Sequence, residues 1–218
     1  MRRNTLVLAA LLAWGVAWLA WAATEQDVAN LIDNMSISSA AKATVKSGFL
    51  RGIQDGRLSA DGAFDFLQRV STSGAPIADR ETVLVAIASA LLEDLPVEML
   101  INKVVEGLAR GLAMDVIAAE VVERRQTLGE VKALLNQKGA TAANFAQTAV
   151  DAAITDIATV LESHVRDGKD PNDGTLRDQV LGALGRDGRV GSSLFQALSN
   201  ALSEGELAAI ATHIENRI

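Results

Sequence analysis

Three oxygen-bearing side chains stand close together in one polar stretch and could bind a metal ion. Asp170, Asn172 and Asp173 lie within residues 166–174, between two predicted helices. Calcium takes about 6–8 oxygen ligands, and carboxylate and amide oxygens suit it. The stretch is therefore a candidate calcium site.

The spacing of this stretch departs from that of an EF-hand loop. With Asp170 at position 1, Gly174 falls at position 5, and Leu181 stands where the bidentate glutamate belongs. The alternative is a solvated turn, in which Pro171 ends one helix and Asp173 caps the next. The turn is the favoured interpretation, so no metal ion is assigned.

The two histidines, His164 and His213, each lie late in a predicted helix. A cation there interacts favourably with the helix dipole, so both are expected to serve as caps or at the edge of the core. His164 and Asp167 are close enough in sequence to share a helix face, but a zinc site needs a further ligand from elsewhere.

No motif for nucleophilic catalysis is visible. The chain has no cysteine, no serine stands in a Gly-x-Ser-x-Gly elbow, and the serines are interpreted as helix caps. A carboxylate-dependent hydrolase of cell-wall glycans would need one or two acids and aromatic sugar platforms. Tyrosine is absent, and the tryptophans all lie within residues 1–22. The acids considered, which are interpreted as surface residues, are Glu98, Glu106, Glu120 and Glu123, the last two on a charged face with Arg124 and Arg125.

Composition argues against nucleotide and nucleic-acid chemistry. The formal charge is −7; without Arg2 and Arg3 the 20 Lys and Arg residues fall to 18 against 27 Asp and Glu, which gives −9. Phosphate backbones are bound by Lys and Arg that displace condensed cations. The glycine pairs end helices and do not link a strand to a helix, so no phosphate-binding loop is recognised. No cofactor is expected.

All the elements that would position these residues are predicted to be α-helices. Helix formers dominate, only three prolines occur, and apolar residues recur at helical spacing. Short turns make successive helices antiparallel, so we expect an all-α bundle or array of αα-hairpins with about nine to ten helices. The expected helices are 25–35, 39–55, 59–71, 78–94, 96–110, 113–137, 140–167, 173–186, 192–202 and 204–217.

The turns carry helix-end signals. In residues 55–59, Gly56 can adopt the left-handed conformation that ends a helix, and Ser59 can cap the next helix. A second turn repeats this layout before Ser192, and residues 203–206 form a capping box.

Two glycine pairs, Gly52 with Gly56 and Gly107 with Gly111, follow apolar helices. They indicate either close helix approach, which is favoured, or a degenerate helical repeat. Of two other apolar segments, 83–92 is expected to be the most buried element and 140–165 to be a long amphipathic helix that faces the core. Residues 83–92 are apolar on all sides and should have neighbours all round, and 140–165 carry one broad apolar stripe.

Residues 1–22 have the layout of a signal peptide. Arg2 and Arg3 precede an uncharged apolar run, and small residues at Ala20 and Ala22 place a cleavage before Ala23. The run is also about as long as the ~17–25 residues of a membrane span, so retention as an anchor is the alternative. Cleavage is favoured, and the chain is predicted to be exported: periplasmic or secreted, or membrane-anchored if the segment is retained.

The polar stretch 166–174 is the expected domain join. It predicts a main helical domain at 23–167 and a C-terminal helical subdomain at 168–218, after the signal segment 1–22.

A helical array without a reactive cluster favours a non-enzymatic function. The chain is predicted to be a protein-interaction or structural module of the cell envelope or periplasm, with a protein partner. The alternative is a carrier of a small apolar or lipid-like ligand; a cell-wall hydrolase ranks third. No nucleic-acid partner is expected, and membrane contact is expected only through an uncleaved N-terminal segment. The carrier's cavity would be lined by Phe49, Phe64, Phe66, Phe145 and Phe195.

Overall fold

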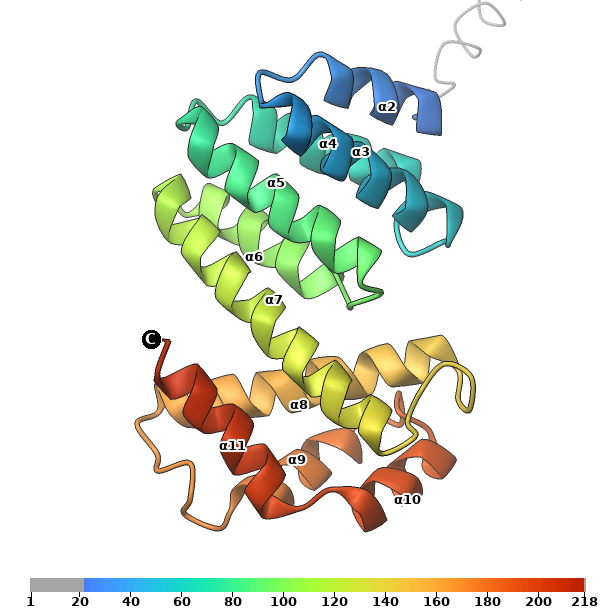
Figure 1. Cartoon of the computed structure of the whole chain (residues 1–218), viewed down its shortest axis with the longest axis vertical. Helices are drawn as coiled ribbons and strands as arrows, with labels where there is room; N and C mark the ends of the chain where they lie inside the picture. The colour runs from blue at the N-terminus through green and yellow to red at the C-terminus, as the bar shows by residue number, and fades with distance from the viewer. Residues whose placement is uncertain (1–21, 218) are drawn as a thin grey trace, which may run out of the picture.

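Ten α-helices and no strand make up residues 22–217, which are the residues that the computed structural model describes (Figure 1). The all-α prediction is confirmed, whereas the signal-segment prediction for residues 1–22 falls almost wholly outside this range. No helix in the described range is long and apolar enough to cross a bilayer. The helices are α2 (Glu25–Asp33), α3 (Ser39–Gln54), α4 (Ala60–Ser71), α5 (Ile77–Leu92), α6 (Glu98–Ala109), α7 (Met114–Gln137), α8 (Gln147–Arg166), α9 (Leu176–Leu184), α10 (Ser192–Ala201) and α11 (Glu204–Glu215).

Several predicted helix ends are confirmed by their hydrogen bonds. The Ser59 hydroxyl accepts from the Gly62 backbone N–H at the start of α4. Ser203 and Glu206 form the expected capping box of α11. At the end of α3, Gly56 has a φ of +69°, the left-handed conformation that glycine adopts without strain.

Helix α8 begins at Gln147, so the predicted start at residue 140 is wrong. Gly139, with a φ of +71°, ends α7, and the Asn144 side-chain amide donates to the Gly139 carbonyl at 2.7 Å. This local hydrogen bond competes with helix formation, as asparagine side chains commonly do. Residues 140–146 therefore form a turn.

Two predicted caps are also wrong. Asp173 does not cap α9 itself: its Oδ1 accepts from the Thr175 backbone N–H (2.8 Å) and hydroxyl (2.7 Å), which makes a tight turn before the helix. The first N–H groups of α9 instead donate to the carboxylate of Glu204, at the start of α11. Ser192 is the first residue of α10, whose cap position is taken by Gly191 with a φ of +73°.

The first six helices form two layers of three. Helices α3, α5 and α7 pack side by side in one layer, and α2, α4 and α6 in the other, each hairpin joining the layers by a short turn (Figure 1). The array of αα-hairpins is thus the arrangement expected from the short turns.

Close approach of α3 and α5 holds the first layer together. A Cβ added to Gly48 would lie 2.5 Å from the Ala88 carbonyl oxygen, and one added to Gly52 would lie 2.6 Å from Leu91 Cδ2. At the start of α7, Ile117 fills the corresponding space over Gly107, where an added Cβ would lie 2.7 Å from it. Within the glycine pairs, the close-approach interpretation therefore holds for Gly52 and Gly107 alone, because a Cβ added to Gly56 or Gly111 would have nothing within 4 Å and both glycines adopt the left-handed conformation that ends a helix.

In Figure 1 the molecule has an upper half, made of α2–α6, and a lower half, made of α8–α11. Helix α7 belongs to both halves. It begins beside α5 and α6 and runs diagonally down to α8 and α11 (Figure 1). In the lower half α8 packs against α9 and α11, the helices that follow it. The predicted join at 166–174 is the turn between α8 and α9, and the division into domains at 167/168 stays a prediction.

A buried ion pair connects α7 to α8. Arg124 donates through Nε and Nη2 to the carboxylate of Glu162, with Nε 2.8 Å from Oε2, and the Glu162 side chain is only 3% exposed. The prediction that Arg124 lies on a solvated face is therefore wrong. The sequence around Arg124 does not reveal its partner, because Glu162 is a single acid within the apolar stripe of α8. Nearby, Arg217 donates to Glu130 and to the buried Thr127, which ties the end of the chain to α7.

Gly48→Ala should lower the free energy of unfolding by about 1–3 kcal/mol, because the atoms that the new Cβ meets belong to the backbone of α5 and cannot rotate away. Urea denaturation of the purified protein measures the change. Gly129→Ala on α7 is the matched control, since nothing lies within 4 Å of that Cβ. It should leave stability unchanged or raise it by about 0.5–1 kcal/mol; equal effects of the two substitutions would contradict the close approach.

Glu162→Gln should cost about 2–3 kcal/mol, since it leaves the Arg124 guanidinium without its anionic partner in a largely buried site. Glu106→Gln removes the partner of Arg110 in an exposed pair and should cost less than about 0.5 kcal/mol. The same denaturation measurement reads both. A loss for Glu162→Gln no larger than that for Glu106→Gln would mean that the pair does not hold α8 to α7.

Candidate interaction surface

The candidate calcium residues are engaged in hydrogen bonds within their own loop. The Asp170 carboxylate accepts from the Asn172 backbone N–H at 2.8 Å, and Asp173 accepts twice from Thr175. Hydrogen bonds to Thr175 hold the pKa of the Asp173 carboxyl below its usual value. Within residues 22–217 no group of three His, Asp or Glu side chains gathers in a geometry that could hold a metal ion.

The two histidines occupy different environments. His164 is fully buried, with Nε2 3.0 Å from the Asp170 carbonyl oxygen and 3.7 Å from Asp173 Oδ2, so it ties the 166–174 turn to α8. It lies inside the core and not at its edge. His213 is exposed, with Nδ1 3.8 Å from a Glu130 oxygen.

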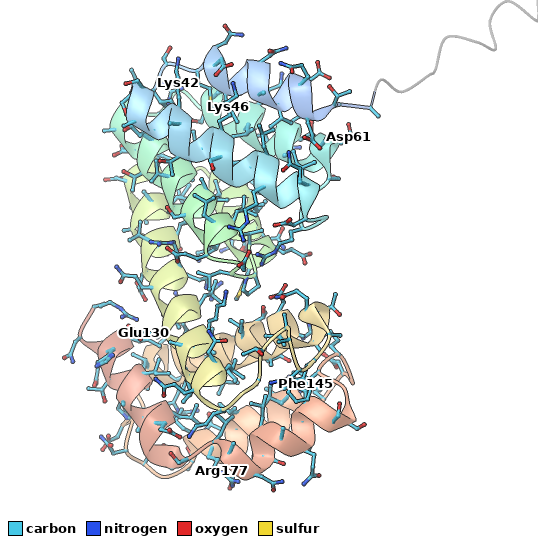
Figure 2. The ribbon with its side chains drawn as sticks, turned by 45° about the vertical axis from the view of Figure 1, so that its right-hand side comes forward. Lys42, Lys46, Asp61, Glu130, Phe145 and Arg177 are labelled. Carbon is cyan, nitrogen blue, oxygen red and sulfur yellow. The ribbon has the colours of Figure 1, made fainter. Side chains whose placement is uncertain are left out.

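The phenylalanines do not converge on one cavity in the described structure. Phe49 and Phe66 stack in the core of the upper half, with ring centroids 6.0 Å apart. Phe64 lines a hollow beside α4, whereas Phe145 and Phe195 pack against the core of the lower half (Figure 2). The five phenylalanines therefore do not line one common cavity, and the carrier alternative stays a hypothesis.

An open groove of about 750 Å³ runs along the outer side of α5, beside α7. At a rise of about 1.5 Å per residue, its length from Ile77 to Ser89 is about 18 Å, or three helical turns. We call it the α5–α7 groove. It is lined by Ile77, Ala78, Glu81, Thr82, Val85, Ala86 and Ser89 of α5 and by Val122 and Arg125 of α7.

This groove corrects the expectation that residues 83–92 have neighbours all round. Most of the segment is buried, but Val85 and Ser89 are only partly covered and face the groove. Ile77, at the start of the groove, is 50% exposed. The apolar run of residues 83–92 was the sequence signal for the groove, because apolar surface left uncovered on a helix invites a further neighbour.

A carboxylate and a guanidinium stand at different points of the groove. Glu81 accepts from the Ser38 backbone N–H at 2.9 Å and from its hydroxyl at 2.7 Å, and thereby ties the start of α3 to α5. The backbone bond first, and then the hydroxyl, lower the pKa of the Glu81 carboxyl. Near the other end, Arg125 donates to Glu93. The positive charge of Arg125 is thus balanced by Glu93, whereas the Glu81 carboxylate is held by neutral donors of Ser38.

A second group of charges fixes the two halves relative to each other. Arg57 Nη1 lies 3.5 Å from Asp94 Oδ1, and Nη2 lies 3.7 Å from Asp151 Oδ2 on α8. Asp94 has a φ of +52°, a conformation that costs a non-glycine residue energy. Burial raises the pKa of the Asp151 carboxyl although Arg57 lowers it. These contacts hold the turns after α3 and α5 against α8.

Comparison of the chain with protein-family models, with curated proteins and with solved structures finds no match. The chemistry of the α5–α7 groove is therefore the observation from which a function can be argued.

Glu81→Gln should lower the melting temperature near pH 7 by a few degrees, because the amide accepts more weakly than the carboxylate from Ser38. Since the folded-state pKa lies below the unfolded value, this contribution is present above the unfolded pKa of about 4.3 and is lost as pH falls through the folded one. Thermal melts of both proteins across this range should converge at low pH. A difference that persists there would contradict the capping role. The exposed Glu98→Gln, at the start of α6, is the control for the loss of a carboxylate from a first helical turn.

Proposed function

We propose that the chain is an exported, non-enzymatic protein-interaction module that binds an amphipathic helix of an envelope protein in the α5–α7 groove. The observation that carries the proposal is an open groove three helical turns long along α5, in which apolar Ile77, Val85 and Val122 alternate with small and polar side chains. Amphipathic helices bind such grooves by burying residues at i, i+3, i+4 and i+7.

The side chains of the groove favour a helix over a bulkier ligand. Ala78, Thr82, Ala86 and Ser89 recur at helical spacing and are small, which lets a partner's backbone approach α5 closely. Val85 and Val122 supply branched apolar surface between them. Helix α5 already packs in this manner against α3, where glycines take the role of the small residues.

The Glu81 carboxylate favours one direction for the bound helix. A helix carries partial positive charge at its N-terminus and partial negative charge at its C-terminus. An occupant parallel to α5 would place its N-terminus near the Glu81 carboxylate, which matches the charge there. The bound helix would then run parallel to α3, α5 and α7, the helices of the layer on which it packs.

Export is supported by the sequence pattern of residues 1–22, with its basic start, apolar run and small residues before Ala23. An exported interaction module meets its partner in the periplasm or outside the cell. The partner is then expected to present an exposed helix with a stripe of Leu, Val, Ile or Ala.

A photo-reactive residue in place of Val85, introduced into the exported chain, should cross-link to one envelope protein within a helix of that pattern. Val116 is the matched control position, because it is 47% exposed on α7 but does not line the groove. Mass spectrometry of the cross-linked peptides identifies the segment and its direction. Val85→Asp should abolish co-purification of that protein, and Val116→Asp should not. Equal cross-linking from both positions, or adducts with lipid alone, would overturn the proposal.

A further inference from the structure

A second hollow, of about 420 Å³, lies where the described part of the chain begins. We call it the acidic hollow. Figure 2 shows Asp61 on α4 beside this point. The hollow is lined by Ala23, Asp27, Asp61, Phe64 and Asp65.

The backbone nitrogen of Ala23 is held inside this hollow. It donates to Asp61 Oδ1 at 2.5 Å. The next residue, Thr24, caps α2 and is fixed by a capping box: its backbone N–H and hydroxyl donate to Asp27 Oδ2 at 2.9 Å and 2.7 Å. The capping box therefore fixes the residue next to Ala23, and the Asp61 carboxylate holds the Ala23 nitrogen itself.

The charges around this nitrogen are unbalanced. Asp27 on α2 and Asp61 and Asp65 on α4 bring three carboxyl groups, and among the described residues that line the hollow none carries a positive charge. A peptide N–H offers one donor and no charge. An α-ammonium at the same atom would offer three donors and a positive charge, which is what these carboxylates lack.

We propose that the chain is processed before Ala23 and that the new α-ammonium group forms an ion pair with Asp61 in the acidic hollow. Water adds across the Ala22–Ala23 peptide bond: the carboxylate leaves on residues 1–22 and the ammonium stays on Ala23. The enzyme is a signal peptidase of the exporting cell, and the small residues Ala20 and Ala22 are the pattern that such an enzyme requires. The proposal rests on the export part of the proposed function, not on its groove.

The ion pair gives the processed protein a characteristic pH dependence. An α-amino group ordinarily titrates near pH 7.7–8.0, roughly, and a carboxylate partner raises this value in the folded state. Its contribution to stability is present below the unfolded pKa and is lost as pH rises through the folded one. The groups that face the amine are the carboxyls of Asp27 on α2 and of Asp61 and Asp65 on α4.

The first experiment establishes the processing site. The full-length chain is produced in an exporting bacterial host, purified from the periplasm or membrane, and analysed by intact mass and N-terminal sequencing. A protein that begins at Ala23 supports the proposal. A chain that retains residues 1–22, or that begins at another residue, overturns it.

The second experiment tests the ion pair in the processed protein. Thermal melts are compared for four proteins. Two carry the free α-amine, with Asp61 or with Asp61→Asn. The other two are the same proteins after selective transamination, which converts the α-amine to a ketone. Near neutral pH either change should lower the melting temperature by about 2–4 °C, and both together should lower it no further. Well above the amine's pKa the four proteins should differ much less.

Asp79→Asn is the matched control, because Asp79 also lies in the first turn of a helix, α5, but not in the acidic hollow. Its effect and that of the transamination should add. Additive effects of Asp61→Asn and transamination would overturn the ion pair even if processing occurs at Ala23. The cross-link at position 85 is a separate measurement, so failure of the groove proposal and failure of this one are distinguishable.

Discussion

The contact between Gly48 and the backbone of Ala88 is the constraint on which the upper half of the molecule depends. It brings α3 and α5 closer than any side chain at position 48 would allow. At that separation Ser38 reaches Glu81, so the beginning of α3 is capped by its neighbour as well as by its own hydroxyl. The same approach fixes the rotation of α5, which leaves Val85 on the outer side.

The lower half is held by polar contacts more than by close backbone approach. Glu162 and His164 are buried on α8, and each finds a partner in another segment: Arg124 on α7 and the carbonyl of Asp170. Buried polar groups that are satisfied in this way permit few alternative packings. Together with the Arg57 contacts, they define how the two halves meet.

Most of the fold follows from local sequence signals, whereas the candidate surface does not. Helical periodicity, Gly56 and the capping box at Ser203 predict the helices and their order because those signals act within a few residues. Glu204, which caps α9 from the start of α11, and Arg124, which pairs with Glu162, act between segments far apart in the sequence. The groove likewise depends on packing between distant segments. The sequence of α5 shows an apolar run, but it does not show which side of the helix stays uncovered.

Helix α7 places two adjacent arginines in different roles: Arg125 lines the groove, and Arg124 is bonded to Glu162 of α8. A helix is stiff along its axis, and the guanidinium and carboxylate of the buried pair cannot separate without a large cost. A partner that displaces α7 as it enters the groove would therefore carry α8 with it, together with the α9 and α11 helices that pack on α8.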